Sequence, residues 1–262
     1  MNTAAAAAAQ YLALSRRAMF GTLRKPTSFV PSLLFPLMFL ALTSSSLERS
    51  ISIEGFPEVD SFLQFAVATA VIQGVIFGSI SAGSGMAEDI EGGFFERLIA
   101  SPVARTSILA GRLAGTAALG FCQAWIYFAV TSIFGLSVEG GLAGMLAVAI
   151  VAAALAAGVG SISVALAIKT GSAEATEGSF PLFFALLFLS SAYFPRSLME
   201  GWFKAAATLN PMSYLLESLR SIVVAELSAL NFFTALGIAL GVLVVGLAVA
   251  SALLKRRLAM DA

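Results

Sequence analysis

Long apolar stretches, separated by short polar segments, make up most of this chain. A helix needs roughly 20 apolar residues to cross the hydrocarbon core of a bilayer. The pattern predicts six such helices, at about 28–46, 62–85, 107–134, 142–168, 179–194 and 231–254. The stretches are continuous rather than alternating, so we expect an all-α polytopic membrane protein and not a barrel. The fifth stretch is the shortest, and Pro181 lies near its start.

The composition supports a membrane protein and excludes several kinds of chemistry. Hydrophobic residues make up 59% of the 262 residues and charged residues 11%, whereas soluble proteins have about 45–50% and about 25%. Lys plus Arg and Asp plus Glu are 15 each, so no net charge indicates binding to nucleic acid. The chain has no histidine, which excludes Ser-His-Asp triads and histidine-based zinc motifs.

The distribution of basic residues predicts the orientation. If the N-terminus is cytoplasmic, only four of the 15 Lys and Arg residues lie outside: Arg49, Arg196, Lys204 and Arg220. Cytoplasmic loops carry the excess of Lys and Arg, so both termini are predicted to be cytoplasmic in a multi-pass protein of the cell (inner or plasma) membrane. Residues 1–27 mix apolar and basic side chains, which predicts an interfacial helix ending in a bend at Pro26. The alternative for this segment is a solvated basic leader.

Two segments between the predicted spans are more than short connectors. The cytoplasmic segment 86–105 places Phe95, Leu98 and Ile99 on one helical face, with acidic residues around Gly92. This pattern predicts a short amphipathic helix, which either docks on a cytosolic partner or packs on its own bundle. The external segment 195–230 predicts helices at, or dipping into, the outer interface.

Within the external segment, Asn210 can cap a helix that begins at Pro211. Leu215, Leu219 and Ile222 form an apolar stripe on that helix. Glu217 and Arg220 are spaced as an i, i+3 ion pair.

The two segments resemble the signatures of ABC-2 type permeases. The first resemblance runs from Glu91-Gly92 to Glu96-Arg97-Leu98, then through Ser101-Pro102-Val103 and 108–112; the second is 209–214 with Glu217 and Leu219-Arg220. Residues 171–175 and 178–181 are further similar to daunorubicin-resistance permeases. The resemblance implies one ABC-2 (type V exporter) transmembrane domain over 1–262, with an external cap that includes Asn210, Pro211, Tyr214, Glu217 and Arg220.

The resemblance also implies partners. A cytosolic ABC ATPase would dock on a coupling helix in 86–105, where the residues concerned are Glu88, Asp89, Glu91, Gly92, Phe95, Glu96 and Arg97. No Gly-Lys pair occurs, so the chain has no phosphate-binding loop of the G-x-x-x-x-G-K type. ATP and Mg are therefore expected on the partner, with no cofactor, metal or catalytic residue on this chain. One set of six spans suggests a homodimer in the lipid bilayer; a heterodimer with a sister permease is the alternative.

A substrate path is predicted along the second and fifth spans, which the resemblance implies line the central cavity. Phe65, Thr69, Gln73 and Phe77 follow one another at i+4 steps, as do Phe184 and Phe188. The alternative is helix packing, because Gly74 and Gly78 form a small-residue face beside them. No ionisable residue is expected deep in a span. We expect an ATP-driven exporter of an amphipathic or hydrophobic small molecule, drug-like or lipid-like, working by alternating access; export of a polysaccharide or lipid-linked glycan is the alternative.

Overall fold

Every regular element is a helix in the computed structural model, which describes residues 3–101 and 105–260. This confirms the all-α prediction for the described part. The long helices are α1 (Thr3–Leu23), α2 (Pro26–Leu47), α3 (Phe62–Glu91), α5 (Arg105–Ile133), α6 (Gly141–Thr170) and α11 (Ala229–Met260). The short ones are η1 (Glu48–Ser52), α4 (Phe94–Ala100), α7 (Ala173–Glu177), α8 (Phe180–Phe188), η2 (Arg196–Leu198), α9 (Gly201–Leu209) and α10 (Pro211–Val224).

Five helical segments of the described chain are long and apolar enough to cross a membrane. They are Phe29–Ser52, Phe62–Glu91, Ser107–Ile133, Gly141–Thr170 and Ala229–Arg257. The predicted fifth span, 179–194, contains only the nine-residue α8, which Gly178 and Ser179 separate from α7. A helix of nine residues is about 14 Å long and cannot cross the roughly 30 Å core alone. A sixth crossing therefore stays a prediction.

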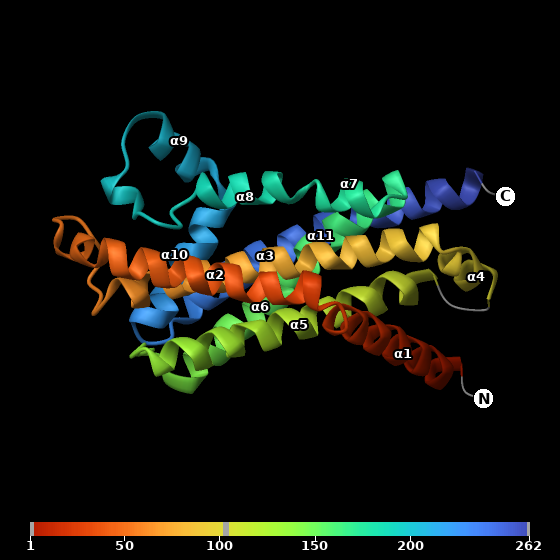
Figure 1. Ribbon diagram of the computed structural model, residues 1–262, viewed down its shortest axis with the longest axis horizontal. Helices are drawn as coiled ribbons and strands as arrows, with labels where there is room; N and C mark the ends of the chain where they lie inside the picture. The colour runs from red at the N-terminus through yellow and green to blue at the C-terminus, as the bar shows by residue number, and fades with distance from the viewer. Residues whose placement is uncertain (1–2, 102–104, 261–262) are drawn as a thin grey trace.

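The chain nevertheless runs between the two ends of the bundle along this broken segment. Figure 1 shows α1, α4 and the last turns of α11 at one end, which we call the α4 end, and α9 at the other. The segment from α7 through α8 leads from the α4 side toward α9. α6 packs against α11, α3 and α5, and α1 packs along α5. The predicted N-terminal helix is thus present, with its turn before Pro26; its place at a membrane surface stays a prediction.

Small residues let α3 and α5 approach closely. A Cβ atom on Gly74 would lie 2.0 Å from the Tyr127 hydroxyl, and one on Gly78 would lie 2.8 Å from Gln123 Oε1. The Tyr127 hydroxyl donates to the Ser32 carbonyl (2.7 Å), so the same side chain also forms a hydrogen bond to α2. Gly74 and Gly78 therefore serve the close helix packing that we gave as the alternative for this part of the chain.

The end of α3 differs from the prediction. The second span was expected to end near residue 85, but α3 continues to Glu91, with Met86, Ala87 and Ile90 buried. Gly93 then adopts a left-handed conformation (φ 66°), and the separate helix α4 follows. Glu88, Asp89 and Glu91 therefore belong to α3 rather than to a loop helix. Residues 102–104 of the predicted cytoplasmic segment, which include Pro102 and Val103 of the signature, lie outside the described residues.

Residues 195–230, which we predicted to be external, contain helices, and one predicted contact needs correction. Asn210 Oδ1 accepts a hydrogen bond from the backbone N–H of Met212 (2.9 Å), and α10 begins at Pro211, as predicted. Leu215, Leu219 and Ile222 are all buried. The predicted ion pair of Glu217 with Arg220 is not formed: Glu217 pairs with Arg196, and Arg220 donates to backbone carbonyls.

Candidate functional site

An aromatic cavity of about 530 Å³ lies between α2, α3 and α8. Phe35, Phe77, Phe180 and Phe184 line it. Their rings contact one another: Phe77 lies 4.6 Å from Phe180 and 5.6 Å from Phe35, measured between ring centroids. The polar groups around it are few, the hydroxyls of Ser32, Ser81 and Ser84 and the carboxylate of Glu177 among them. Such a lining suits an apolar ligand with a flat ring system.

The structure brings only part of the predicted substrate path to this cavity. Phe77 and Phe184 line it, and Phe188 continues the cluster, 4.4 Å from Phe184 between centroids. Phe65, Thr69 and Gln73 are instead buried inside the chain, at 0%, 2% and 1% exposure. The predicted continuous face is thus not open, because α10 and the segment after α8 cover its outer part.

Two of those buried residues have clear roles in packing. The hydroxyl of Thr69 donates to the carbonyl of Ala192 (2.8 Å), and the ring of Phe65 packs against the guanidinium of Arg220. Gln73 differs, because its Nε2 has no hydrogen-bond partner within the described part of the chain. An unpaired buried amide is costly, and the substrate role predicted for Gln73 stays a prediction.

Sequence reasoning missed the α2 side of the cavity. Phe35 and Phe39 are one helical turn apart on α2, and their rings contact Phe77 and Phe188 respectively. Phe180 extends the i+4 series of α8 by one turn. The signal was present as aromatic i+4 pairs, but the sequence alone could not show that α2 packs beside α8.

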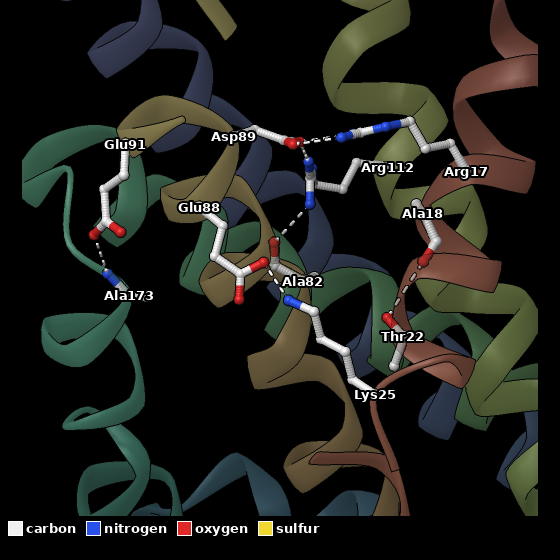
Figure 2. A network of polar contacts seen from close by, with 10 residues as sticks. All are labelled: Arg17, Ala18, Thr22, Lys25, Ala82, Glu88, Asp89, Glu91, Arg112 and Ala173. Carbon is white, nitrogen blue, oxygen red and sulfur yellow. Dashed lines mark hydrogen bonds and ion pairs between the residues drawn. The ribbon is translucent and has the colours of Figure 1, made fainter. Parts of the chain in front are cut away.

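At the α4 end, Asp89 and Glu88 of α3 contact α1, α5 and the residue just before α2 (Figure 2). Asp89 accepts two hydrogen bonds from Arg17 of α1, at 2.6 and 2.8 Å, and also pairs with Arg112 of α5. Next to it, Glu88 pairs with Lys25. The hydrogen bond to Asp89 raises the pKa of the Arg17 guanidinium above its ordinary value. This network connects α1, α3 and α5 near the point where α4 leaves the bundle.

A further acidic residue connects α3 to α7. The Glu91 carboxylate accepts from the backbone N–H of Ala173 (3.2 Å), and Glu91 is otherwise exposed. Glu88, Asp89 and Glu91, predicted to face an ATPase, therefore all have partners within the chain.

α4 packs its apolar face on its own bundle. Phe95 is 2% exposed, and Leu98 and Ile99 pack against the same cluster. Glu96 and Arg97 point outward as exposed side chains, although Glu96 lies 3.8 Å from Arg257. Of the predicted coupling residues, Phe95 is thus not available to a partner in this conformation. The exposed face of α4 is polar.

At the opposite end, a buried arginine joins three segments. Arg220 of α10, 5% exposed, donates to the carbonyls of Phe65, Ser191 and Ala192 at 2.9, 3.0 and 3.1 Å. Its guanidinium carbon lies 3.5 Å from the centroid of the Phe65 ring. Burial lowers the pKa of Arg220 to about 9, so it remains cationic at neutral pH. The sequence did not reveal this burial, because the partners are backbone carbonyls.

The other charged groups of the cap form their own cluster. Arg196 Nε donates to Glu217 (2.7 Å), and its guanidinium lies 4.3 Å from the Tyr214 ring centroid. The hydrogen bond to Glu217 raises the pKa of Arg196 above its ordinary value. With Asn210 donating to the carbonyls of Leu186 and Leu189, α10 is tied to both α8 and η2.

These features define a helical multi-pass membrane protein with an aromatic cavity and polar ties at both ends of the bundle. Residues 9–224 match the ABC-2 type transporter family, and the chain belongs to that family. It is 25% identical over 213 residues to the daunorubicin resistance ABC transporter permease protein DrrB1 of Streptomyces coeruleorubidus, covering 79% of this chain and 72% of that protein. It is 26% identical over 212 residues to a protein described as a transport permease, ycf38, of Porphyra purpurea, covering 80% and 72%.

Proposed function

We propose that this chain is the transmembrane subunit of an ATP-driven exporter for amphipathic or hydrophobic small molecules. The observation that carries the proposal is the aromatic cavity between α2, α3 and α8. Its volume, about 530 Å³, lies within the roughly 300–1,000 Å³ of small-molecule sites. A relative whose name refers to daunorubicin resistance supports a drug-like cargo. Serine hydroxyls at one side of the rings would orient a ligand that has a polar group.

The energy for export comes from a separate cytosolic ATPase, which binds ATP and Mg. We place its docking surface on the exposed side of α4, at Glu96 and Arg97, with the α4 end in the cytoplasm. A displacement of α4 is transmitted to α3 through the short turn at Gly92 and Gly93. The ion pairs of Asp89 then transmit it to α1 and α5, and the ion pair of Glu88 transmits it to Lys25, just before α2. Alternating access then opens the cavity toward the α9 end.

A second copy of the chain completes the transporter. In the apolar segments Phe29–Ser52 and Ala229–Arg257, only 17% of the most apolar stretch is buried within one chain. Large apolar side chains of α11 such as Phe233, Val244 and Val245 are exposed. Lipid covers part of this surface, and a homodimer contact covers the rest.

The cavity assignment is tested by ATP-dependent uptake of a fluorescent anthracycline into inside-out vesicles that contain the permease and its ATPase. Phe77→Ala removes a ring from the centre of the cavity and should lower uptake at least fivefold, because a ring stacked on a planar ligand is worth about 1 kcal/mol. Trp202→Ala, on the exposed α9, is the matched control and should leave uptake unchanged. If Phe77→Ala inserts normally and transports like the control, the cavity is not the site. Uptake of labelled lipid-linked glycan instead of the anthracycline would favour the glycan alternative.

A further inference from the structure

A second cavity, of about 670 Å³, adjoins the aromatic one at the α4 end. It lies among α1, the two residues that connect α1 to α2, and helices α3, α5 and α7. Ser81, Ser84 and Glu177 line both cavities. The two cavities therefore adjoin each other, and we call the second one the cationic cavity.

The lining of the cationic cavity has an excess of positive charge. Five of its lining side chains are cationic: Arg16, Arg17, Arg24, Lys25 and Arg112. Its acidic lining side chains are Glu88, Asp89 and Glu177. The formal balance is +5 and −3, that is +2.

The excess equals the charge of two residues, because Glu177, which makes no ion pair within the described residues, offsets the charge left where Arg17 and Arg112 share Asp89. Asp89 is shared by two arginines, and Glu88 pairs with Lys25. Arg16 and Arg24 are exposed and make no ion pair within the described residues, although Arg16 lies over the Phe20 ring. Two guanidinium groups thus line the cavity without an anionic partner.

A buried hydroxyl lies between the two cavities. Ser84 is 6% exposed, and its Oγ has no hydrogen-bond partner within the described chain. Buried polar atoms are nearly always paired, so Ser84 is available to donate a hydrogen bond to a ligand in this cavity. A phosphate oxygen in the cationic cavity would accept this hydrogen bond.

Helix α1, which carries Arg16 and ends one residue before Arg24, also presents apolar side chains. Leu12 is 68% exposed, and Phe20 and Leu23 are each 39% exposed. A helix with exposed apolar and basic residues suits the headgroup region of a bilayer. The ligand that reaches this cavity is therefore more easily supplied by the bilayer than by bulk solvent.

We propose that the cationic cavity binds the phosphate of an anionic phospholipid from the inner leaflet, with the apolar part of the lipid directed toward the aromatic cavity. Basic pockets on the cytoplasmic side of membrane helices recognise such headgroups. The proposal rests on the orientation given under Proposed function, but not on the identity of the cargo. Arg16 and Arg24 supply charge, and Ser84 donates a hydrogen bond.

Competition binding tests the site directly on the purified full-length chain in phosphatidylcholine nanodiscs. Dansyl-labelled phosphatidylglycerol is the probe, and energy transfer from tryptophan reports its binding. The wild-type chain should prefer phosphatidylglycerol to phosphatidylcholine. Arg16→Gln and Arg24→Gln should each weaken binding about fivefold, and the double variant on the order of 20-fold. Arg256→Gln changes an exposed arginine at the same end, outside the cavity, and should bind like the wild type.

Ser84→Ala separates binding from folding. It removes an unpaired buried hydroxyl, so the thermal midpoint should stay or rise, while lipid affinity falls. Equal affinity for the two lipids, or equal weakening by Arg256→Gln, would overturn the proposal. Displacement of the probe by millimolar inorganic phosphate would assign the site to a free anion and overturn the lipid assignment. A chain that exports with its ATPase yet shows no lipid preference would refute this inference and leave the proposed function standing.

Discussion

Replacing Asp89 by Asn tests whether this carboxylate holds the α4 end of the bundle together. The substitution keeps the shape of the side chain and removes its charge. Asp89 accepts three hydrogen bonds from Arg17 and Arg112. The single amide oxygen of Asn could accept only part of them, because its Nδ2 is a donor. Both arginines would lose their anionic partner, and the Ala82 carbonyl would stay 3.3 Å from Arg112 Nη1.

The expected cost follows from burial. The side chains of Asp89 and Arg112 are 12% and 13% exposed. Removing one partner of a fully buried pair costs about 3–5 kcal/mol, and an exposed pair is worth about 0–1 kcal/mol. Arg17 is 48% exposed and adds little. We therefore expect Asp89→Asn to cost about 2–4 kcal/mol, closer to the buried limit.

The assay is thermal unfolding of the detergent-purified chain, followed by loss of the monodisperse peak in size-exclusion chromatography. Asp89→Asn should lower the midpoint by roughly 5–10 °C. Glu88→Gln is the matched control, one residue away, because its pair with Lys25 is 47% and 45% exposed; its effect should stay within about 1 kcal/mol. The Asp89→Asn/Arg112→Gln double variant should be destabilised by less than the sum of the two single variants. Equal effects of Asp89→Asn and Glu88→Gln would refute the reasoning.

Three further predictions follow from the packing and the exposed faces. Gly74→Ala should destabilise by about 2–3 kcal/mol, because its Cβ would collide with a tyrosine of α5, whereas Gly241→Ala, with nothing within 4 Å, should change the unfolding midpoint little. Arg220→Lys should destabilise by about 2–3 kcal/mol in the same assay, since one ammonium cannot reproduce the planar fork that reaches three carbonyls; retention of wild-type stability would show that the fork is dispensable. Arg97→Glu should abolish ATP-dependent uptake without lowering the unfolding midpoint, while Arg256→Glu should transport normally; equal transport by both would remove α4 as the docking surface.

Local features of the sequence were sufficient for much of the fold. Continuous apolar stretches predicted the five long apolar helices, and the Asn210-Pro211 pair predicted the start of α10, because both signals act within one element. The end of α3 was misplaced because its acidic residues resemble a solvated loop. In the structure Asp89 is neutralised by Arg17 and Arg112, which are 72 and 23 residues away in sequence.

The candidate site was predictable only in part, for a related reason. Phe77 and Phe184 were recognised as aromatic residues on apolar helices, but the residues predicted to share the helical face of Phe77 are buried within the chain. Phe65 was assigned to the same face, yet α10 covers it with Arg220. Which part of a helical face remains open depends on neighbouring helices, and one sequence does not specify how they pack.

The subunit composition of the native complex tests the central claim most directly. We would purify the tagged chain from the membranes of its own host in mild detergent and determine the intact mass and the identity of every stoichiometric component. We expect two copies of this chain with two copies of a cytosolic ABC ATPase, and no ATP hydrolysis by the permease isolated alone. A stable functional assembly that contains no ATPase, or ATP hydrolysis by the isolated permease, would contradict it.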